Sequence, residues 1–241
     1  YGAIDPEVKS LTETAAKVFE ELGCTVEEAD IVLDPLFEAF WSLFGAVSLA
    51  RNPTVLDLHS DELTVYARDA YERGASTTGA DYAKALGEID KIKVRFTDQF
   101  KIYDLILTPT MAVSPFPHGE PPTVIDGQEV SAFPGSFPHT YPINMIGHPA
   151  ASVPCGFSAE GLPIGLHIIG RWGDEAMVIA ASAAFEQARP WADQLPLFFH
   201  QVPIKHLSLN LMSHNLEQLY LIEHHRHSFY KPKYIYHAIS L

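Results

Sequence analysis

The sequence predicts an α/β or α+β fold, in which helices and short buried strands share one core. The first observation is an amphipathic helix over residues 5–23, followed directly by a strand-like, alternating segment over 24–29. The second is a pair of short apolar runs, over 150–153 and 164–169, each bounded by turn-forming residues. Runs of this kind are typical of strands that fill the inside of a sheet.

The link between the two apolar runs, SAEGLP, predicts a turn. Gly161 can adopt a positive φ, and Pro163 fixes the backbone at the entry to the second run. A hairpin or a closely spaced strand pair is therefore expected. The surrounding stretch, residues 140–171, shows no amphipathic pattern, so no helix is expected in it.

The first helix has clear signals at both ends. Asp5 is placed to cap it, Pro6 suits its first turn, and Gly23 stops it. Thr78 and Asp81 stand at the spacing of a capping box ahead of a later helix. Apolar periodicity predicts three further helices in the first half of the chain, over residues 35–50, 63–71 and 82–100.

The pattern changes after residue 101. Residues 105–107 form a short apolar strand, and Pro109 breaks it where a ligand-facing loop would begin. Residues 111–139 are rich in Pro and Gly, show no period and retain several aromatic side chains, which favours a functional loop over a disordered linker. A helix packed closely on a sheet is expected over residues 174–188.

Composition limits the classes of function. The chain has 241 residues, enough for one large domain, with two smaller domains as the alternative. Its composition, 47% hydrophobic and 19% charged, is typical of a soluble globular protein. A net charge of −14 and the lack of a basic stripe argue against direct nucleic-acid binding, because phosphates are bound by clustered Lys and Arg. The longest apolar run, 36–50, is too short to cross a bilayer of about 30 Å.

The cysteines point to a cellular compartment. Cys24 and Cys155 lie in apolar surroundings and are interpreted as buried free thiols, with a disulfide between them as the alternative. Free thiols favour a reducing compartment, so the predicted location is the cytoplasm.

The last part of the chain, residues 194–241, differs in composition from the rest. It contains seven of the twelve histidines: His200, His206, His214, His224, His225, His227 and His237. A metal site at His224, His225 and His227 is one hypothesis, but adjacent histidines point in different directions and no Cys or carboxylate stands with them. We therefore predict no metal, and a poorly ordered or aberrant extension to a domain over residues 1–193.

Three segments together resemble a known family. They are YDLILTPTMAVSP, TYPINMIGHPAASVPCGF and GLPIGLHIIGRWGDEAMVIAASAAFEQARPW. Their order and spacing resemble the carboxy-terminal portion of the amidase signature family, in which a Thr-Pro-Thr-like turn precedes Asn-x-x-Gly-x-Pro, Ser-Val-Pro-x-Gly and Gly-Leu-Pro-x-Gly segments. The resemblance covers roughly residues 1 to 193 and fails for the tail.

The resemblance implies a fold and an activity. The fold would be α/β of the amidase type, a mixed β-sheet layered between α-helices, here incomplete. The activity would be hydrolysis of a linear amide, or transfer of its ammonia, by a serine activated through a second serine and a lysine, without a cofactor. In the family these residues lie upstream of the matching segments, and no Gly-Ser-Ser-Gly-Gly stretch occurs here. None of the catalytic residues can be assigned to this chain.

The resemblance does assign one wall of a substrate cleft. Thr110, Thr140 and Asn144 are the predicted contacts for a small-molecule amide substrate. A purely structural role is the alternative, in which Asn144 caps the turn at Gly147 and Thr110 satisfies the end of a strand. The further partners expected are the missing amino-terminal half of the domain or a second copy of the chain.

Three hypotheses about function remain open. The first is the carboxy-terminal part of an amidase, starting partway through a gene product and inactive alone. The second is a noncatalytic binding or scaffold subunit derived from the same fold. The third, an amidase that uses Cys155 as nucleophile, lacks a visible partner base. A truncated sheet would also carry exposed strand edges and be poorly soluble.

Overall fold

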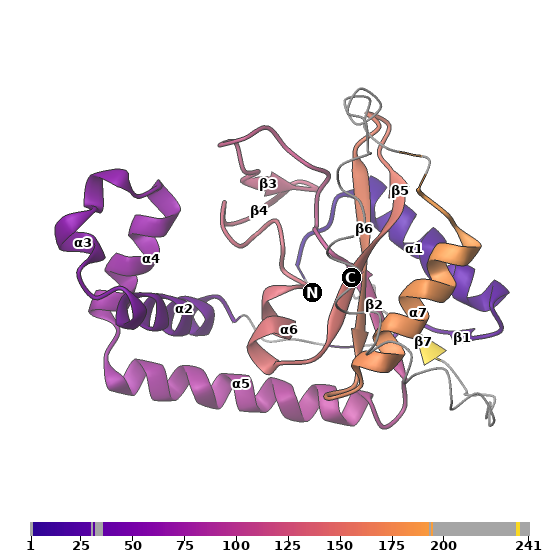
Figure 1. Cartoon of the computed structure of the whole chain (residues 1–241), viewed down its shortest axis with the longest axis horizontal. Helices are drawn as coiled ribbons and strands as arrows, with labels where there is room; N and C mark the ends of the chain where they lie inside the picture. The colour runs from indigo at the N-terminus through magenta and orange to yellow at the C-terminus, as the bar shows by residue number, and fades with distance from the viewer. Residues whose placement is uncertain (1, 30, 32–35, 193, 195–234, 237–241) are drawn as a thin grey trace, which may run out of the picture.

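A computed structural model describes residues 2–29, 31, 36–192, 194 and 235–236. Figure 1 shows the helices and strands in this part of the chain. The helices are α1 (Pro6–Glu21), α2 (Phe37–Arg51), α3 (Val55–Leu58), α4 (Val65–Ser76), α5 (Gly79–Gln99), α6 (Tyr141–Ile146) and α7 (Glu175–Ala188), with a 3₁₀ turn at Ser60–Glu62. The strands are β1 (Thr25–Val26), β2 (Leu105–Pro109), β3 (Val124–Ile125), β4 (Gln128–Glu129), β5 (Ala150–Phe157), β6 (Pro163–Gly170) and β7 (Ile235–Tyr236).

The central sheet has three antiparallel strands in the order β2-β6-β5. β5 and β6 are joined by the predicted hairpin, and Gly161 in its turn has a φ of 78°. β2 joins from a distant part of the sequence, with Thr108 opposite His167. β1 and β7 form a separate parallel pair.

Helices cover both faces of this sheet, which confirms the predicted α/β class. On one face α1 and α7 pack on alternate strand residues, so that Phe19 and Phe185 bury Leu107, Leu166 and the residues around them. On the other face α5 and α6 cover the end of the sheet that carries Ile106 and Ile169. The remainder of that second face bears polar side chains.

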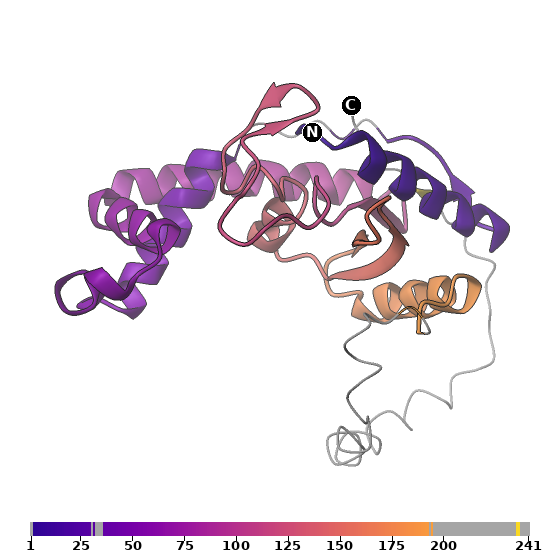
Figure 2. The ribbon, with the colours of Figure 1, turned by 90° about the horizontal axis from the view of Figure 1, so that it is seen from above.

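α2, α3 and α4 form a helical arm that projects away from the sheet (Figures 1 and 2). Glycines allow α2 and α4 to touch through their backbones. A Cβ atom on Gly45 would lie 2.6 Å from the carbonyl oxygen of Ala70, and one on Gly74 would lie 2.5 Å from the carbonyl carbon of Gly45. Backbone atoms cannot move aside as a side chain can, so the arm requires both glycines.

Replacing Gly74 with alanine is therefore expected to reduce the free energy of unfolding by about 1–3 kcal/mol, as in other overpacked sites. Urea denaturation followed by circular dichroism would measure it. Gly87→Ala is the matched control, because Gly87 is exposed on α5 and a Cβ there meets no atom within 4 Å. The control should stabilise the chain by about 0.5–1 kcal/mol, and a similar gain in Gly74→Ala would contradict the packing.

Several predicted elements are confirmed. Asp5 caps α1, with its Oδ1 accepting from the amides of Glu7 at 2.9 Å and Val8 at 3.3 Å. Thr78 and Asp81 form the capping box of α5. The strand predicted over residues 24–29 is shorter, since β1 covers only Thr25–Val26.

The prediction that residues 140–171 contain no helix is wrong. α6 occupies Tyr141–Ile146, with Pro142 in its first turn and Gly147 as a left-handed C-cap at a φ of 75°. Six residues are too few to show amphipathic periodicity, although the proline and glycine at its ends were visible signals. The loop 111–139 also contains a short hairpin, β3–β4, that the sequence did not predict.

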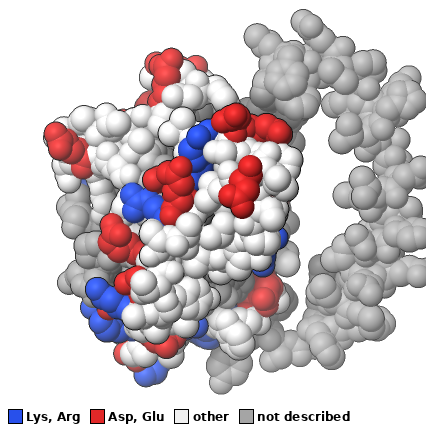
Figure 3. Space-filling model, turned by 90° about the vertical axis from the view of Figure 1, so that its left-hand side faces the viewer, with Lys and Arg blue, Asp and Glu red and all other residues white. Residues whose placement is uncertain are grey.

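Figure 3 shows acidic and basic side chains interspersed over the end of the molecule that the arm occupies. No helix in the described part of the chain combines the length and the hydropathy needed to cross a bilayer. The histidine cluster at 224–227 lies outside the described residues, and of the tail 194–241 the structure describes only residue 194 and β7.

Candidate functional site

A row of polar side chains crosses the sheet on the face that α5 and α6 cover only in part. Strand register places Thr108, His167 and Ser152 side by side on β2, β6 and β5. Thr108 Oγ1 lies 3.1 Å from His167 Nδ1. Thr110 directly follows β2, and its Oγ1 lies 2.7 Å from Ser152 Oγ. Four residues from three separate segments of the chain thus form one polar surface.

Gly165 makes the Thr110–Ser152 contact possible. β6 lies between β2 and β5, so the two hydroxyl groups meet above β6. A Cβ atom on Gly165 would lie 2.7 Å from Ser152 Oγ and 2.8 Å from Thr110 Oγ1. The amide of Thr110 also donates to the carbonyl of Gly165 at 2.9 Å, which holds the threonine at this position. The absence of a side chain at Gly165 therefore brings the hydroxyl pair together.

His167 in this row is buried and cannot readily carry a charge. Its side chain is 6% exposed, and burial lowers its pKa to about 4. Thr108 Oγ1 also contacts the carbonyl of Pro109 at 3.1 Å as a donor, which favours a proton on Nδ1 of His167. At neutral pH His167 is an uncharged imidazole that positions Thr108. Ser152, in contrast, is exposed.

A hollow of about 240 Å³ adjoins the hydroxyl pair through Gly165. Its wall comes from the segment after β2 and from the start of β6. The lining residues are Met111, Val113, Ser114, Pro115 and Phe116, together with residues 163–165. The hydroxyl pair with this hollow can bind a polar group beside an apolar one.

The three residues predicted to contact substrate lie in different surroundings. Thr110 belongs to the hydroxyl pair. Thr140 precedes α6, and its Oγ1 donates to the carbonyl of Phe137 at 3.2 Å. Asn144 is exposed and lines another hollow, of about 400 Å³, beside His148 and the start of β5. The structure thus groups Thr110 with Ser152, and a substrate contact for Thr140 and Asn144 stays a prediction.

Ser152 and Gly165 were not singled out from the sequence, and Thr108 was singled out only as part of the Thr108–Met111 turn near the expected cleft. The alternation of buried Val153 with exposed Ser152 was a visible signal that Ser152 faces away from the α1–α7 side. Their grouping, however, depends on the pairing of β2 with β6, which a local pattern does not specify.

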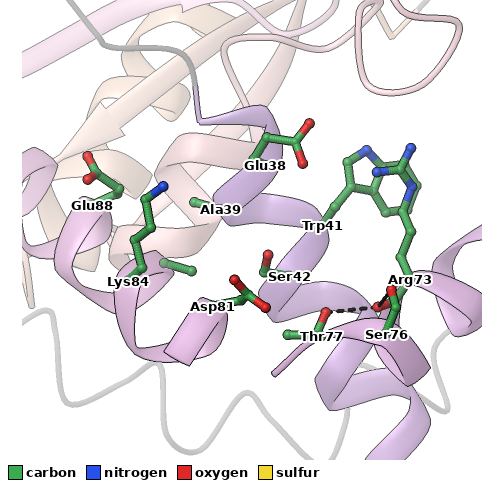
Figure 4. Close-up of a pocket in the computed structure, with 11 residues that line it drawn as sticks. Glu38, Ala39, Trp41, Ser42, Arg73, Ser76, Thr77, Asp81, Lys84 and Glu88 are labelled. Carbon is green, nitrogen blue, oxygen red and sulfur yellow. Dashed lines mark hydrogen bonds between the residues drawn. The ribbon is translucent and has the colours of Figure 1, made fainter. Parts of the chain in front are cut away.

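A larger hollow, of about 530 Å³, lies between α2, α4 and α5 (Figure 4). Its charged lining residues include Glu38, Lys84 and Arg73. Arg73 is held there by an ion pair with Asp69 at 3.1 Å and lies 5.2 Å from the centre of the Trp41 ring. These contacts serve to pack the helices, and this hollow is separate from the polar row.

Cys155 is unsuited to nucleophilic catalysis. It is a free thiol on β5, and burial raises its pKa to about 12. At pH 8 only about one molecule in ten thousand would carry the reactive thiolate. Cys24 is also free, and burial, with a smaller effect of Asp104, raises its pKa.

We expect Cys155 in the folded chain to react with iodoacetamide at pH 8 at least about 100-fold more slowly than in the urea-unfolded chain. Mass spectrometry of tryptic peptides over time would measure both rates, with the unfolded chain as the control. Equal rates would show that Cys155 is accessible and ionised, and would revive the cysteine hypothesis.

No group of three His, Cys, Asp or Glu side chains within the described ranges is arranged to hold a metal ion. The site there consists of hydroxyl groups, one neutral imidazole and an apolar wall. Such groups can bind and orient an uncharged polar molecule, but they do not by themselves form a pair of nucleophile and base.

Comparisons with known proteins agree on one family. The model of the family described as Amidase matches residues 1–179. An acylamidase of Rhodococcus erythropolis is 32% identical over 198 residues, covering 81% of this chain and 42% of the relative. One subunit of the glutamyl-tRNA(Gln) amidotransferase of Lacticaseibacillus casei is 32% identical over 219 residues, covering 80% of this chain and 44% of the relative.

A solved structure shows the same arrangement of elements. It is the crystal structure of a bacterial aryl acylamidase of the amidase signature family, with a TM-score of 0.72 and 28% identity. The match covers 80% of this chain and 42% of that one. The chain spans about two fifths of the length of the relatives it matches.

Proposed function

Because the chain belongs to the Amidase family, we propose that residues 1–193 form the carboxy-terminal part of an amidase domain. The domain would hydrolyse a linear carbon–nitrogen amide bond to an acid and ammonia or an amine. The order of the Thr-Pro-Thr, Asn-x-x-Gly-x-Pro and Gly-Leu-Pro-x-Gly segments supports this placement. Residues 194–241 would lie outside the domain.

The observation that carries this proposal is the hydroxyl pair above Gly165. Thr110 and Ser152 come from two of the family-like segments and meet at 2.7 Å beside an apolar hollow. A hydroxyl pair both donates and accepts, so it suits an amide, which offers a carbonyl acceptor and an N–H donor. Thr110, and with it Thr140 and Asn144, would contact the substrate or the loop that carries the nucleophile.

The bond-breaking step would come from residues outside this chain. The family resemblance implies a serine nucleophile, a second serine and a lysine, with backbone N–H groups that hold the oxyanion. This chain would supply one wall of the cleft and hold the amide in register with that serine. Such a division accounts for a binding surface without a nucleophile–base pair.

The partners follow from the same proposal. The chain would bind a small-molecule amide and assemble with the amino-terminal half of an amidase domain, or with a second copy of itself. One of the relatives is named as a subunit of an amidotransferase, and the name indicates a protein that works within an assembly. Free Cys24 and Cys155 support a cytoplasmic location.

A chimera would test the proposed activity. This chain would replace the 198 matched residues of the Rhodococcus acylamidase, so that the relative supplies the remainder of its own domain. Hydrolysis of acetanilide by the folded chimera is the expected result. Co-expression of the two parts as separate chains gives a second arrangement if the fusion fails to fold.

In the chimera, Thr110→Val is expected to lower kcat/KM by up to about tenfold, because one net hydrogen bond contributes roughly 0.5–1.5 kcal/mol. Thr97→Val, on an exposed face of α5, is the matched control and should leave kcat/KM unchanged. Steady-state kinetics would measure both variants, and equal activity in both would place Thr110 outside the cleft.

The second candidate function is a noncatalytic binding or scaffold subunit. It is favoured by the low pKa of His167, about 4, which makes this imidazole a weak base, and by the protonated state of Cys155 at pH 7 elsewhere on β5. A chimera that is folded by circular dichroism and melts cooperatively, yet shows no turnover, would support this alternative.

A further inference from the structure

We infer that the hollow beside the hydroxyl pair holds an uncharged apolar substituent of the amide substrate, an aromatic ring or a short alkyl chain. This inference rests on the proposed amidase function and adds the chemical class of the substrate. It favours a substrate like that of the relative named an acylamidase over one like that of the relative named a glutamyl-tRNA(Gln) amidotransferase subunit.

The position of the hollow links it to the polar site. Gly165 lines the hollow and also lies directly beneath the two hydroxyl groups of Thr110 and Ser152. Met111, another lining residue, follows Thr110 in the chain. Thr110 and Ser152 do not line the hollow themselves, so the hydroxyl pair and the hollow meet at Gly165. In the inferred arrangement the amide contacts the hydroxyl pair, and its substituent extends past Gly165 towards Met111 and Phe116.

The chemistry of the wall is apolar. Among the described residues that line the hollow, none is acidic or basic, and Ser114 provides the only side-chain hydroxyl. A carboxylate or ammonium group placed there would lose its hydration without gaining an ion pair, which is strongly unfavourable. Glutamine carries both charges, so this wall disfavours it.

The size of the hollow fits a single ring. An apolar cavity of roughly 150 Å³ is enough for benzene in another protein. The 240 Å³ here leaves room for one ring and a few further atoms. Phe116 is 38% exposed, so its ring is open to contact with an aromatic substituent.

The test uses the isolated ¹⁵N-labelled chain and three probes: acetanilide, acetamide and glutamine. Acetanilide is expected to shift the amide resonances of residues 111–116 and Gly165 saturably. Its Kd should be at least about tenfold lower than that of acetamide, because only acetanilide carries a ring that leaves water. Glutamine is expected to leave these resonances unchanged.

Two substitutions at Ser114 provide the control. Ser114→Asp introduces a carboxylate into the hollow and should weaken acetanilide binding by about fivefold or more, while Ser114→Asn, of nearly equal size, should change it less than about twofold. Trp172→Ala, at an exposed residue remote from the lining, should leave the Kd unchanged.

Three outcomes would overturn the inference. They are a glutamine Kd equal to or below that of acetanilide, acetanilide shifts that map to other residues, and no saturable shift up to the solubility limit of acetanilide. Binding in the hollow without turnover in the chimera would refute the amidase proposal. The hollow would still be a binding site for an uncharged apolar group. Turnover of acetanilide without shifts at residues 111–116 would refute the assignment of the hollow alone.

Discussion

Lowering the pH from 7 to 4 is expected to reduce the free energy of unfolding by about 3 kcal/mol through His167 alone. The folded chain lowers the pKa of His167 from 6.5 to about 4, because burial disfavours the charged imidazolium. Below pH 6.5 the unfolded chain binds this proton and the folded chain does not, so stability is lost as the pH falls towards 4. Above pH 6.5 both states are neutral and His167 adds no pH dependence.

His167→Asn isolates this effect from other groups. Asparagine can place an N–H near the position of Nδ1 and so keep a donor to Thr108 without a titrating ring. The variant should lose most of the difference in stability between pH 6.5 and 4, as measured by urea denaturation at each pH.

His148 should also reduce the free energy of unfolding as the pH falls, because its pKa is lowered in the folded chain. Burial lowers its pKa, partly offset by the contact of its Nδ1 with the carbonyl of Gly170 at 2.9 Å. Its ring also stacks on Phe100, with centroids 5.0 Å apart.

If the His167→Asn variant kept the full dependence of stability on pH, the conclusion that His167 is buried in the polar row would be wrong.

Truncating Phe185 to alanine is expected to cost about 3–5 kcal/mol of stability, the range for large-to-small changes at buried aromatic residues. Phe185 is 1% exposed and stacks on Phe19, with ring centroids 5.6 Å apart, between α1, α7 and the sheet. Its removal would leave a cavity bounded by strands that cannot collapse around it. Chemical denaturation at pH 7 measures the loss.

Ile179→Ala is the control for this substitution, because Ile179 lies on the same helix and is 68% exposed. It should change the free energy of unfolding by less than about 0.5 kcal/mol. Similar losses in the two variants would mean that α7 does not pack on the sheet through Phe185.

Local signals accounted for much of the fold. α1 was predictable because Asp5 and Pro6 mark its start and its apolar stripe spans several turns. The β5–β6 hairpin was predictable because Gly161 allows the turn between two short apolar runs. α6 was missed because it is shorter than the period needed to identify an amphipathic helix.

Features that depend on distant pairing could not be predicted. β1 was expected to run over residues 24–29, but a strand extends only as far as its partner, and β1 pairs with β7 over two residues. The hydroxyl pair has the same origin, since Thr110 and Ser152 meet only because β6 lies between β2 and β5. The sequence therefore indicated Thr110 as a site residue but not its partner.

The aromatic contacts of Phe133 give the helical arm a role beyond packing. Phe133 lies in the loop 111–139, whose first residues form part of the wall of the hollow, and its ring stacks on Tyr66 of α4 at 5.6 Å and meets Phe137 at 4.8 Å. The contact between Phe133 and Tyr66 therefore joins the loop 111–139 to the arm through aromatic side chains. A ligand that displaced Phe133 would also break its contact with Tyr66 of α4.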